Sequence, residues 1–321
     1  MGWYHADLKR RARIIQEEKL LIKRTIKRTP DMPCLLCKAN KADKTNSHII
    51  PKFLGKDIFN DGNEAYTISS AEMAERPAIV QSSPKESHIL CSECESYFSV
   101  IETSIANGIY KDLWDDKKKV DFTFVPLDGN ATIWISKATE PKQFQLFIYS
   151  IVWRMFVTSN TLFKHFKASS KVIEALRSCL IGYKATNAKD FLENTSKILV
   201  PMTPSKFLIH TCEIIAADGT SNLLAPIPRA NPYYVFMNRW TLMISFGAND
   251  YQDAFKQSNN IVPSNDKIRI VKFKEAAWEA YRRTFINILT RNASQVLQRR
   301  GESPFDYEPF LEGRSKLKAA T

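Results

Sequence analysis

The chain has 321 residues, of which 44% are hydrophobic, and it contains 19 Phe, 6 Trp and 11 Tyr. This is ample material for a packed core, and it excludes a chain that is disordered throughout. Lys and Arg number 46 against 34 Asp and Glu, which gives a net charge of +12. A field of that sign favours phosphate-rich partners or anionic membrane surfaces.

The N-terminal sequence, MGWYHADLKRRARII, has basic residues without the apolar segment of a secretory signal. Gly2 is followed by Ala6 at the position where a myristoylation motif requires Ser or Thr. No uncharged apolar stretch of the sequence is long enough to cross a membrane. We therefore expect a cytoplasmic protein that has no membrane partner.

Residues 1–30 are predicted to form a basic N-terminal helix that ends at Pro30. Isoleucine and leucine side chains recur along one face, and Arg10, Arg11 and Lys23 belong to the other. This basic face could lie along a nucleic-acid backbone. A solvated basic face on a packing helix explains the same pattern.

Two Cys-x-x-Cys pairs follow: CLLC contains Cys34 and Cys37, and CSEC contains Cys91 and Cys94. A reducing compartment keeps thiols free, so a disulfide framework is a poor explanation of these pairs. Four thiolates carried on two tight turns are the usual ligand set of a structural Zn²⁺ site. We predict a zinc-binding domain over residues 31–116.

The segment between the pairs begins with SHIIPKFLG, which contains His48, and the second pair reads LCSECE. Over residues 33–107 this arrangement resembles the HNH endonucleases of the ββα-metal type, in which a treble-clef-like zinc knuckle frames a hairpin and a helix. A fainter resemblance extends to uncharacterised bacterial proteins that have SHIIPKF and a later Ser-x-x-Trp-Arg helix. SIVWR at residues 150–154 fits that second pattern.

The HNH resemblance implies a role for each residue at a matching position. His48 would be the general base of phosphodiester hydrolysis, and Glu95 would bind a catalytic Mg²⁺ or Mn²⁺ from the helix. Ser47 stands where the family has an acidic or histidine ligand of that ion. Glu102 and Ser99 share the helical face of Glu95 and could add a ligand.

Structural explanations of the same residues stay open. His48 could serve only to hold a turn, and a carboxylate such as Glu95 is favoured in the first turn of a helix without any metal. The family's Asn that orients the base has no clear match in SPKESHILC, where Glu86, Ser87 or His88 could take its place. We give His88 a structural role, because four thiolates already complete a tetrahedral site.

Residues 117–321 are predicted to form a mixed body of unknown role. VDFTFVPLDGNATIWIS and YYVFMNRWTLMISFG indicate hairpins, and KFLIHTCEIIAA indicates a strand. Helices are expected over 141–194 and 274–298. Trp153 is expected in the core, with Arg154 in an ion pair or on a phosphate. The fold class is therefore α+β, with a zinc-knuckle HNH-like module preceded by a basic helix and followed by helices and antiparallel strands.

Two functions follow from these patterns. The first is a metal-dependent HNH-type endonuclease that hydrolyses DNA, which the resemblance associates with bacterial defence or mobile elements. The second is a non-catalytic zinc module, a degenerate HNH unit that binds nucleic acid or, through the C-terminal body, a protein partner. Ser47 favours the second function and Glu95 favours the first.

Overall fold

The structure is a computed structural model of the chain. It describes residues 27–55, 58, 65–67, 78–80, 82–128, 130–137, 139–163, 166–197, 211–217, 224–227, 233–245, 267–280, 283, 287, 291, 294, 298 and 301. The predicted basic helix lies outside the described residues, apart from its last positions, 27–30. Residues 27–29 are not helical.

A seven-stranded sheet is the largest element of the fold, with the strand order β5-β6-β11-β7-β10-β9-β8. Neighbouring strands are antiparallel except for β11 and β7, which are parallel. The strands are β5 (Phe122–Asp128), β6 (Ala131–Ser136), β7 (Thr211–Ala217), β8 (Leu224–Ile227), β9 (Tyr233–Met237), β10 (Trp240–Ser245) and β11 (Ile268–Phe273).

Both predicted hairpins are confirmed. β5 and β6 pair from Phe122 opposite Ser136 to Asp128 opposite Ala131. Phe124 lies opposite Trp134, and their rings meet edge to face at 4.8 Å. β9 and β10 turn at Asn238, which has a φ of 59°. Asparagine tolerates this left-handed conformation better than most residues, which explains its place in the turn.

Two strands of the sheet, β8 and β11, are absent from the sequence predictions. In β11, Ile268 and Ile270 are buried whereas Arg269 between them is only half-buried. This alternation is the period of a strand with one face on the core. The pattern in KIRIVKF could therefore have revealed β11 from the sequence.

The predicted helical block is confirmed as three helices that follow β6. α4 is buried all round, as its apolar sequence predicts, and begins with Pro141 in the first turn, where a missing N–H costs nothing. Ser169 caps α5 by accepting a hydrogen bond from the Val172 N–H. The helices are α2 (Lys52–Gly55), α3 (Ser92–Ile105), α4 (Pro141–Val157), α5 (Ser170–Gly182) and α6 (Ala188–Lys197).

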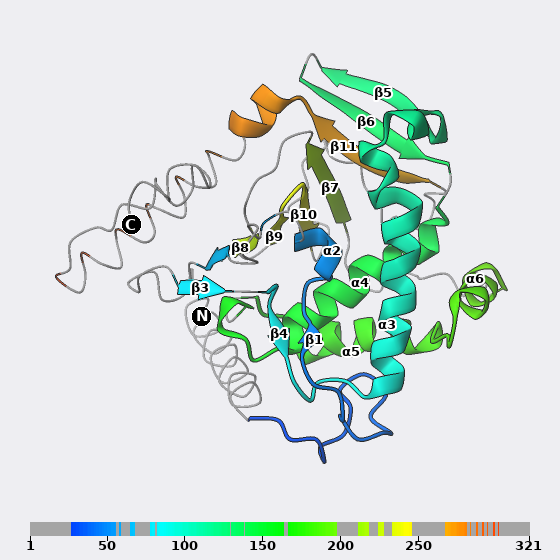
Figure 1. The fold of residues 1–321 in the computed structure, drawn as a ribbon, viewed down its shortest axis with the longest axis vertical. Coiled ribbons are helices and arrows are strands. Elements are labelled where there is room, and N and C mark those ends of the chain that lie inside the picture. The colour runs from blue at the N-terminus through cyan, green and yellow to red at the C-terminus, as the bar shows by residue number, and fades with distance from the viewer. Residues whose placement is uncertain are drawn as a thin grey trace, which may run out of the picture.

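Short helical turns follow α3 and α4, and a further helix begins after β11. A π-helical turn, η2 (Ala106–Tyr110), directly continues α3, and residues 275–280 begin a further helix after β11. The 3₁₀ turns are η3 (Asp112–Trp114), η4 (Asp116–Asp121) and η5 (Thr161–Phe163). In Figure 1, α3 runs from the cysteine region towards β5 and β6.

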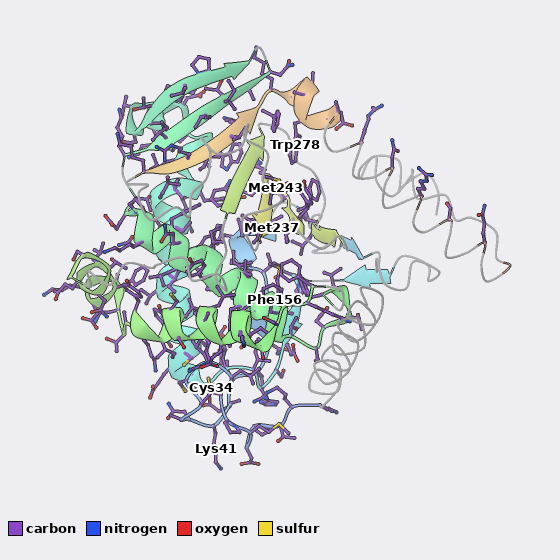
Figure 2. The ribbon with its side chains drawn as sticks, turned by 180° about the vertical axis from the view of Figure 1, so that it is seen from behind. Cys34, Lys41, Phe156, Met237, Met243 and Trp278 are labelled. Atoms are coloured by element: carbon purple, nitrogen blue, oxygen red, sulfur yellow. The ribbon has the colours of Figure 1, made fainter. Side chains whose placement is uncertain are left out.

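One buried cluster runs from Cys34 in the first cysteine pair, through α3, α4 and α5, to Ile270 in β11. Trp153 of α4 is completely buried within it, as predicted, and meets Phe98 of α3 edge to face. Figure 2 shows Cys34 and Trp278 towards opposite ends of the molecule. The mixture of helices and a mainly antiparallel sheet confirms the α+β class.

Two small sheets complete the fold. β1 (Ser47–His48) pairs with β4 (Lys85–Glu86), and β2 (Ala65–Thr67) pairs with β3 (Ala78–Val80), both antiparallel. No helix among the described residues has the length and the apolar character that crossing a membrane requires.

Candidate metal centre and hairpin

The first cysteine pair lies on a tight turn that main-chain hydrogen bonds close. The Lys38 N–H donates to the Cys34 carbonyl over 2.9 Å, and the Cys34 N–H donates to the Asn40 carbonyl over 2.8 Å. Lys38 has a φ of 60°, which reverses the chain after Cys37. The Leu35 N–H donates to Ile89, so this turn is joined to the segment before the second pair.

The second pair lies at the N-terminus of α3. Cys91 precedes the first helical residue and accepts the Glu95 N–H at 3.0 Å, so the first helical turn brings Cys94 back towards Cys91. Asp43 accepts hydrogen bonds from both the N–H and the hydroxyl of Ser92, which lower the pKa of the Asp43 carboxyl. This contact fixes the start of α3 to the loop that follows the first pair.

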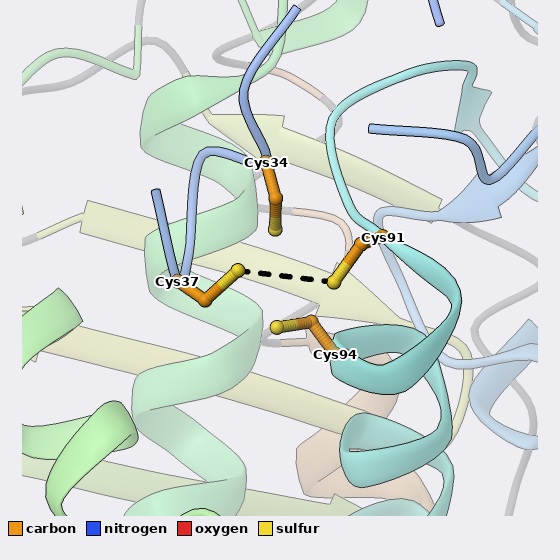
Figure 3. A group of neighbouring side chains, drawn as sticks. All are labelled: Cys34, Cys37, Cys91 and Cys94. Atoms are coloured by element: carbon orange, nitrogen blue, oxygen red, sulfur yellow. Dashed lines mark hydrogen bonds between the residues drawn. The ribbon is translucent and has the colours of Figure 1, made fainter. Parts of the chain in front are cut away.

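The two turns bring all four sulfur atoms within 4.8 Å of one another (Figure 3). The Cys37 and Cys91 sulfurs are 3.8 Å apart. Cys34, Cys91 and Cys94 are buried and Cys37 is half-buried, so the cluster is largely shielded from solvent. Four sulfur ligands at this spacing can bind a metal ion such as zinc.

The four thiols differ in how readily they lose a proton. A hydrogen bond from Cys94 lowers the pKa of Cys34 to about 4, whereas the same hydrogen bond and burial raise the pKa of Cys94, and burial raises that of Cys91. Arg28 is held nearby by hydrogen bonds to the Pro33 and His88 carbonyls, and Lys184 bonds Glu93 at 3.0 Å on the first turn of α3. Cationic side chains beside thiols stabilise the anionic form, which is the form that binds a metal.

β1 and β4 form a two-stranded antiparallel sheet between the two cysteine pairs, here called the β1–β4 hairpin, although residues 49–84 separate the two strands in the sequence. Ser47 lies opposite Glu86 and His48 opposite Lys85. The Ile49 N–H extends the pairing by donating to the Pro84 carbonyl over 2.9 Å. Ser47 is completely buried, and its hydroxyl has no hydrogen-bond partner among the residues that the structure describes.

His48 is half-buried and lies among cations. Lys85 is its direct neighbour across the hairpin, and directly opposed side chains project from the same face. The pKa of His48 is lowered to about 4, first by burial and then by the charges of Lys85, Arg154 and Lys52. The imidazole is therefore uncharged at neutral pH.

The three polar residues that share one face of α3 differ in their surroundings. The Glu102 carboxylate pairs with Arg154 at 2.7 Å, whereas Glu95 is half-buried and Ser99 is exposed. Burial raises the pKa of Glu102, and the charge of Glu95 on the same face adds to this effect. Within the part of the chain that the structure describes, only the four cysteines form a group of three or more His, Cys, Asp or Glu side chains spaced to hold an ion.

The residues expected near the base have other partners. The Glu86 carboxylate bonds Thr158 and Ser159, and the Ser87 hydroxyl accepts the Asn46 N–H. The His88 ring nitrogen bonds the Ala42 carbonyl at 2.9 Å, which agrees with the structural role expected of it.

The sequence prediction did not foresee that Arg154 reaches the hairpin. Arg154 forms the ion pair expected of it, but its partners also include the main-chain carbonyl of His48. The available signal was an arginine within the apolar run IVWRMFV of a helix expected in the core, because a buried charge must find partners.

Comparisons of the chain with protein-family models, curated proteins and solved structures find no match.

Proposed function

We propose that the cysteine cluster of Cys34, Cys37, Cys91 and Cys94 holds one structural Zn²⁺. The close approach of four sulfurs, three of them buried, supports this ion, because four thiolates form the closed tetrahedral site of structural zinc. Such an ion would fix the start of α3 against the first cysteine turn. Free thiolate ligands require a reducing compartment, which agrees with a cytoplasmic location.

We further propose that β1, β4 and α3 form an HNH-like ββα module that hydrolyses DNA phosphodiester bonds. The observation that carries this proposal is the antiparallel hairpin bearing His48, which lies in the sequence between the two cysteine turns, the second of which begins α3. His48 is the general base, since its imidazole is neutral and can take a proton from the attacking water. A pKa of about 4 makes the free imidazole a weak base, and the negative charge of a bound phosphate would raise that pKa towards the pH of the reaction.

Lys85 and Lys52 support a phosphodiester substrate. Both act electrostatically on His48, and Lys52 is exposed. Two cations beside the base would attract the phosphate backbone to it. Glu95 and Ser47 are the candidate ligands of a catalytic Mg²⁺ or Mn²⁺, which would offset the charge that builds on the phosphate in the transition state.

Plasmid cleavage tests this function. Purified protein is incubated with supercoiled plasmid, with and without Mg²⁺ or Mn²⁺, beside a His48→Ala variant. We expect the variant to lose activity by roughly two to four orders of magnitude while its zinc content and DNA affinity stay near wild type. Equal, slow cleavage by both proteins with every metal would show that His48 belongs only to the fold.

A second function is a non-catalytic zinc module that binds nucleic acid or a protein partner. Two observations favour it: Ser47 offers only a hydroxyl at the position of a metal ligand, and Arg154 already neutralises Glu102. DNA binding that weakens steeply with salt, without cleavage, is the expected result for a nucleic-acid module. Salt-independent or absent DNA binding would point to a protein partner, with residues 117–321 as the candidate surface.

A further inference from the structure

The C-terminal end of α4 holds the first strand of the hairpin. Arg154 donates from Nη1 to the main-chain carbonyl of His48 over 2.7 Å, across a separation of 106 residues. The side chain of Arg154 is only 2% exposed. This contact acts on the residue whose imidazole is the proposed base, at the point where that residue joins the main chain.

The other donors of Arg154 go to α3 and to α4 itself. Nη2 pairs with the Glu102 carboxylate at 2.7 Å, and Nε donates to the Ser150 carbonyl over 3.1 Å. The guanidinium also lies 5.0 Å from the centre of the Phe98 ring. A buried guanidinium with this set of partners has one strongly preferred position, because leaving any partner would strand a buried charge.

The residues just after α4 hold the second strand. The Glu86 carboxylate accepts hydrogen bonds from the Thr158 hydroxyl and from the Ser159 N–H, the latter over 2.9 Å. The Ser159 hydroxyl donates to the other Glu86 oxygen. One end of α4 therefore contacts both strands of the hairpin and, through Glu102, the helix that carries Glu95.

From this geometry we infer that Arg154 is a positioning residue for His48. Together with Thr158 and Ser159 it forms a clamp, here called the α4 clamp, that fixes the β1–β4 hairpin against α3. The inference rests on the proposed role of His48 as the base. Residues 31–116 therefore do not hold His48 in place by themselves, because Arg154, Thr158 and Ser159 lie at the end of α4 and just after it.

An Arg154→Lys variant tests the clamp, because lysine keeps the positive charge but cannot bond the His48 carbonyl and Glu102 in the same fork. Arg177→Lys is the matched control. Arg177 likewise donates to a carbonyl, that of Leu36, over 2.8 Å and pairs with Glu174 at 2.6 Å. These partners lie outside the hairpin, but Leu36 belongs to the first cysteine turn, so the zinc content of this control shows whether that turn is disturbed. Three quantities are measured for each protein: zinc per chain, kcat and KM for plasmid, and hydrogen exchange of the Ile49 amide.

We expect Arg154→Lys to lower kcat by roughly 100-fold, the order of loss that a small misplacement of a reacting group causes. KM and zinc content should stay near wild type. Exchange of the Ile49 amide, whose hydrogen bond to Pro84 belongs to the hairpin, should become at least about tenfold faster, because a loosened hairpin opens more often. Arg177→Lys should leave the Ile49 exchange rate unchanged, because neither of its partners belongs to the hairpin.

The amide exchange separates this inference from the proposed function, since it needs no nuclease activity. Wild-type exchange at Ile49 in Arg154→Lys would overturn the clamp, whether or not cleavage is lost. Should Arg154→Lys fail to fold, Thr158→Val replaces it. That change removes the Thr158 hydroxyl that donates to Glu86 and leaves the buried charge of Arg154 in place. Faster exchange at Ile49 in Thr158→Val supports the clamp, and unchanged exchange there overturns it.

Discussion

The Tyr97 hydroxyl donates a hydrogen bond to the main-chain carbonyl of Leu180 over 2.9 Å inside the core. Tyr97 belongs to the second turn of α3, just after the last cysteine, whereas Leu180 lies near the end of α5. α3, which carries the second cysteine pair, is thus joined to α5 by a polar contact as well as by apolar packing.

Replacing Tyr97 by Phe should lower the free energy of unfolding by about 1 kcal/mol, the usual net contribution of one buried hydrogen bond. The ring stays, so packing against Phe98 and Phe191 is kept. Chemical denaturation of the zinc-loaded protein measures the change. A variant as stable as wild type would mean that the Leu180 carbonyl finds another donor.

Replacing Cys91 by Ser should remove the proposed zinc and give insoluble or locally unfolded protein. Structural zinc sites in small modules supply an apparent free energy on the order of 10 kcal/mol. Elemental analysis of freshly purified protein should find one zinc per chain in wild type and in a Cys179→Ser control, because Cys179 is a half-buried thiol outside the cluster. Wild-type protein without zinc would contradict the proposed ion.

The His48 imidazole should stay neutral at pH values well below 6.5, its ordinary pKa, and should titrate near pH 4. Because the folded-state pKa is lowered, the unfolded chain binds the proton first, so this group makes stability fall as the pH decreases from about 6.5 towards 4. NMR of the imidazole carbons in wild type and in Lys85→Met measures the titration. Removal of the Lys85 charge should raise the pKa, although burial remains the larger cause. A pKa of 6.5 in wild type would contradict the half-buried, cationic environment.

Ser47→Asp should tighten binding of Mn²⁺ and raise cleavage if the module is a nuclease, because it restores a carboxylate at the proposed ligand position. Glu95→Gln should lower cleavage, and higher Mn²⁺ should restore part of it. The aspartate of Ser47→Asp would be buried, so the thermal stability of that variant is measured alongside to detect a cost of the new charge. In a module that only binds DNA, Ser47→Asp would leave cleavage absent.

Local patterns predicted those parts of the fold that are local in sequence. The β5–β6 hairpin, the β9–β10 hairpin and the mainly apolar α4 each depend on residues near one another in the chain. The cysteine cluster was predictable for a related reason: spacing and chemistry restrict what two Cys-x-x-Cys pairs can do.

The clamp residues show what could not be predicted. Arg154 bonds His48 across 106 residues, and Thr158 bonds Glu86 across 72. No periodicity connects such positions, because their meeting depends on how α4 packs against α3. The sequence therefore indicated that Arg154 needs a partner, but it did not indicate which one.

The middle of the seven-stranded sheet depends on β11, the last of its strands to be synthesised. β11 lies between β6 and β7 and pairs with both, although it follows both in the sequence. Until residues 268–273 emerge from the ribosome, β6 and β7 lack the strand that pairs with both of them, and open strand edges readily pair with other chains. A chain stopped before residue 268 would therefore leave two sheet fragments without the strand that joins them, and we expect such a nascent chain to need a chaperone.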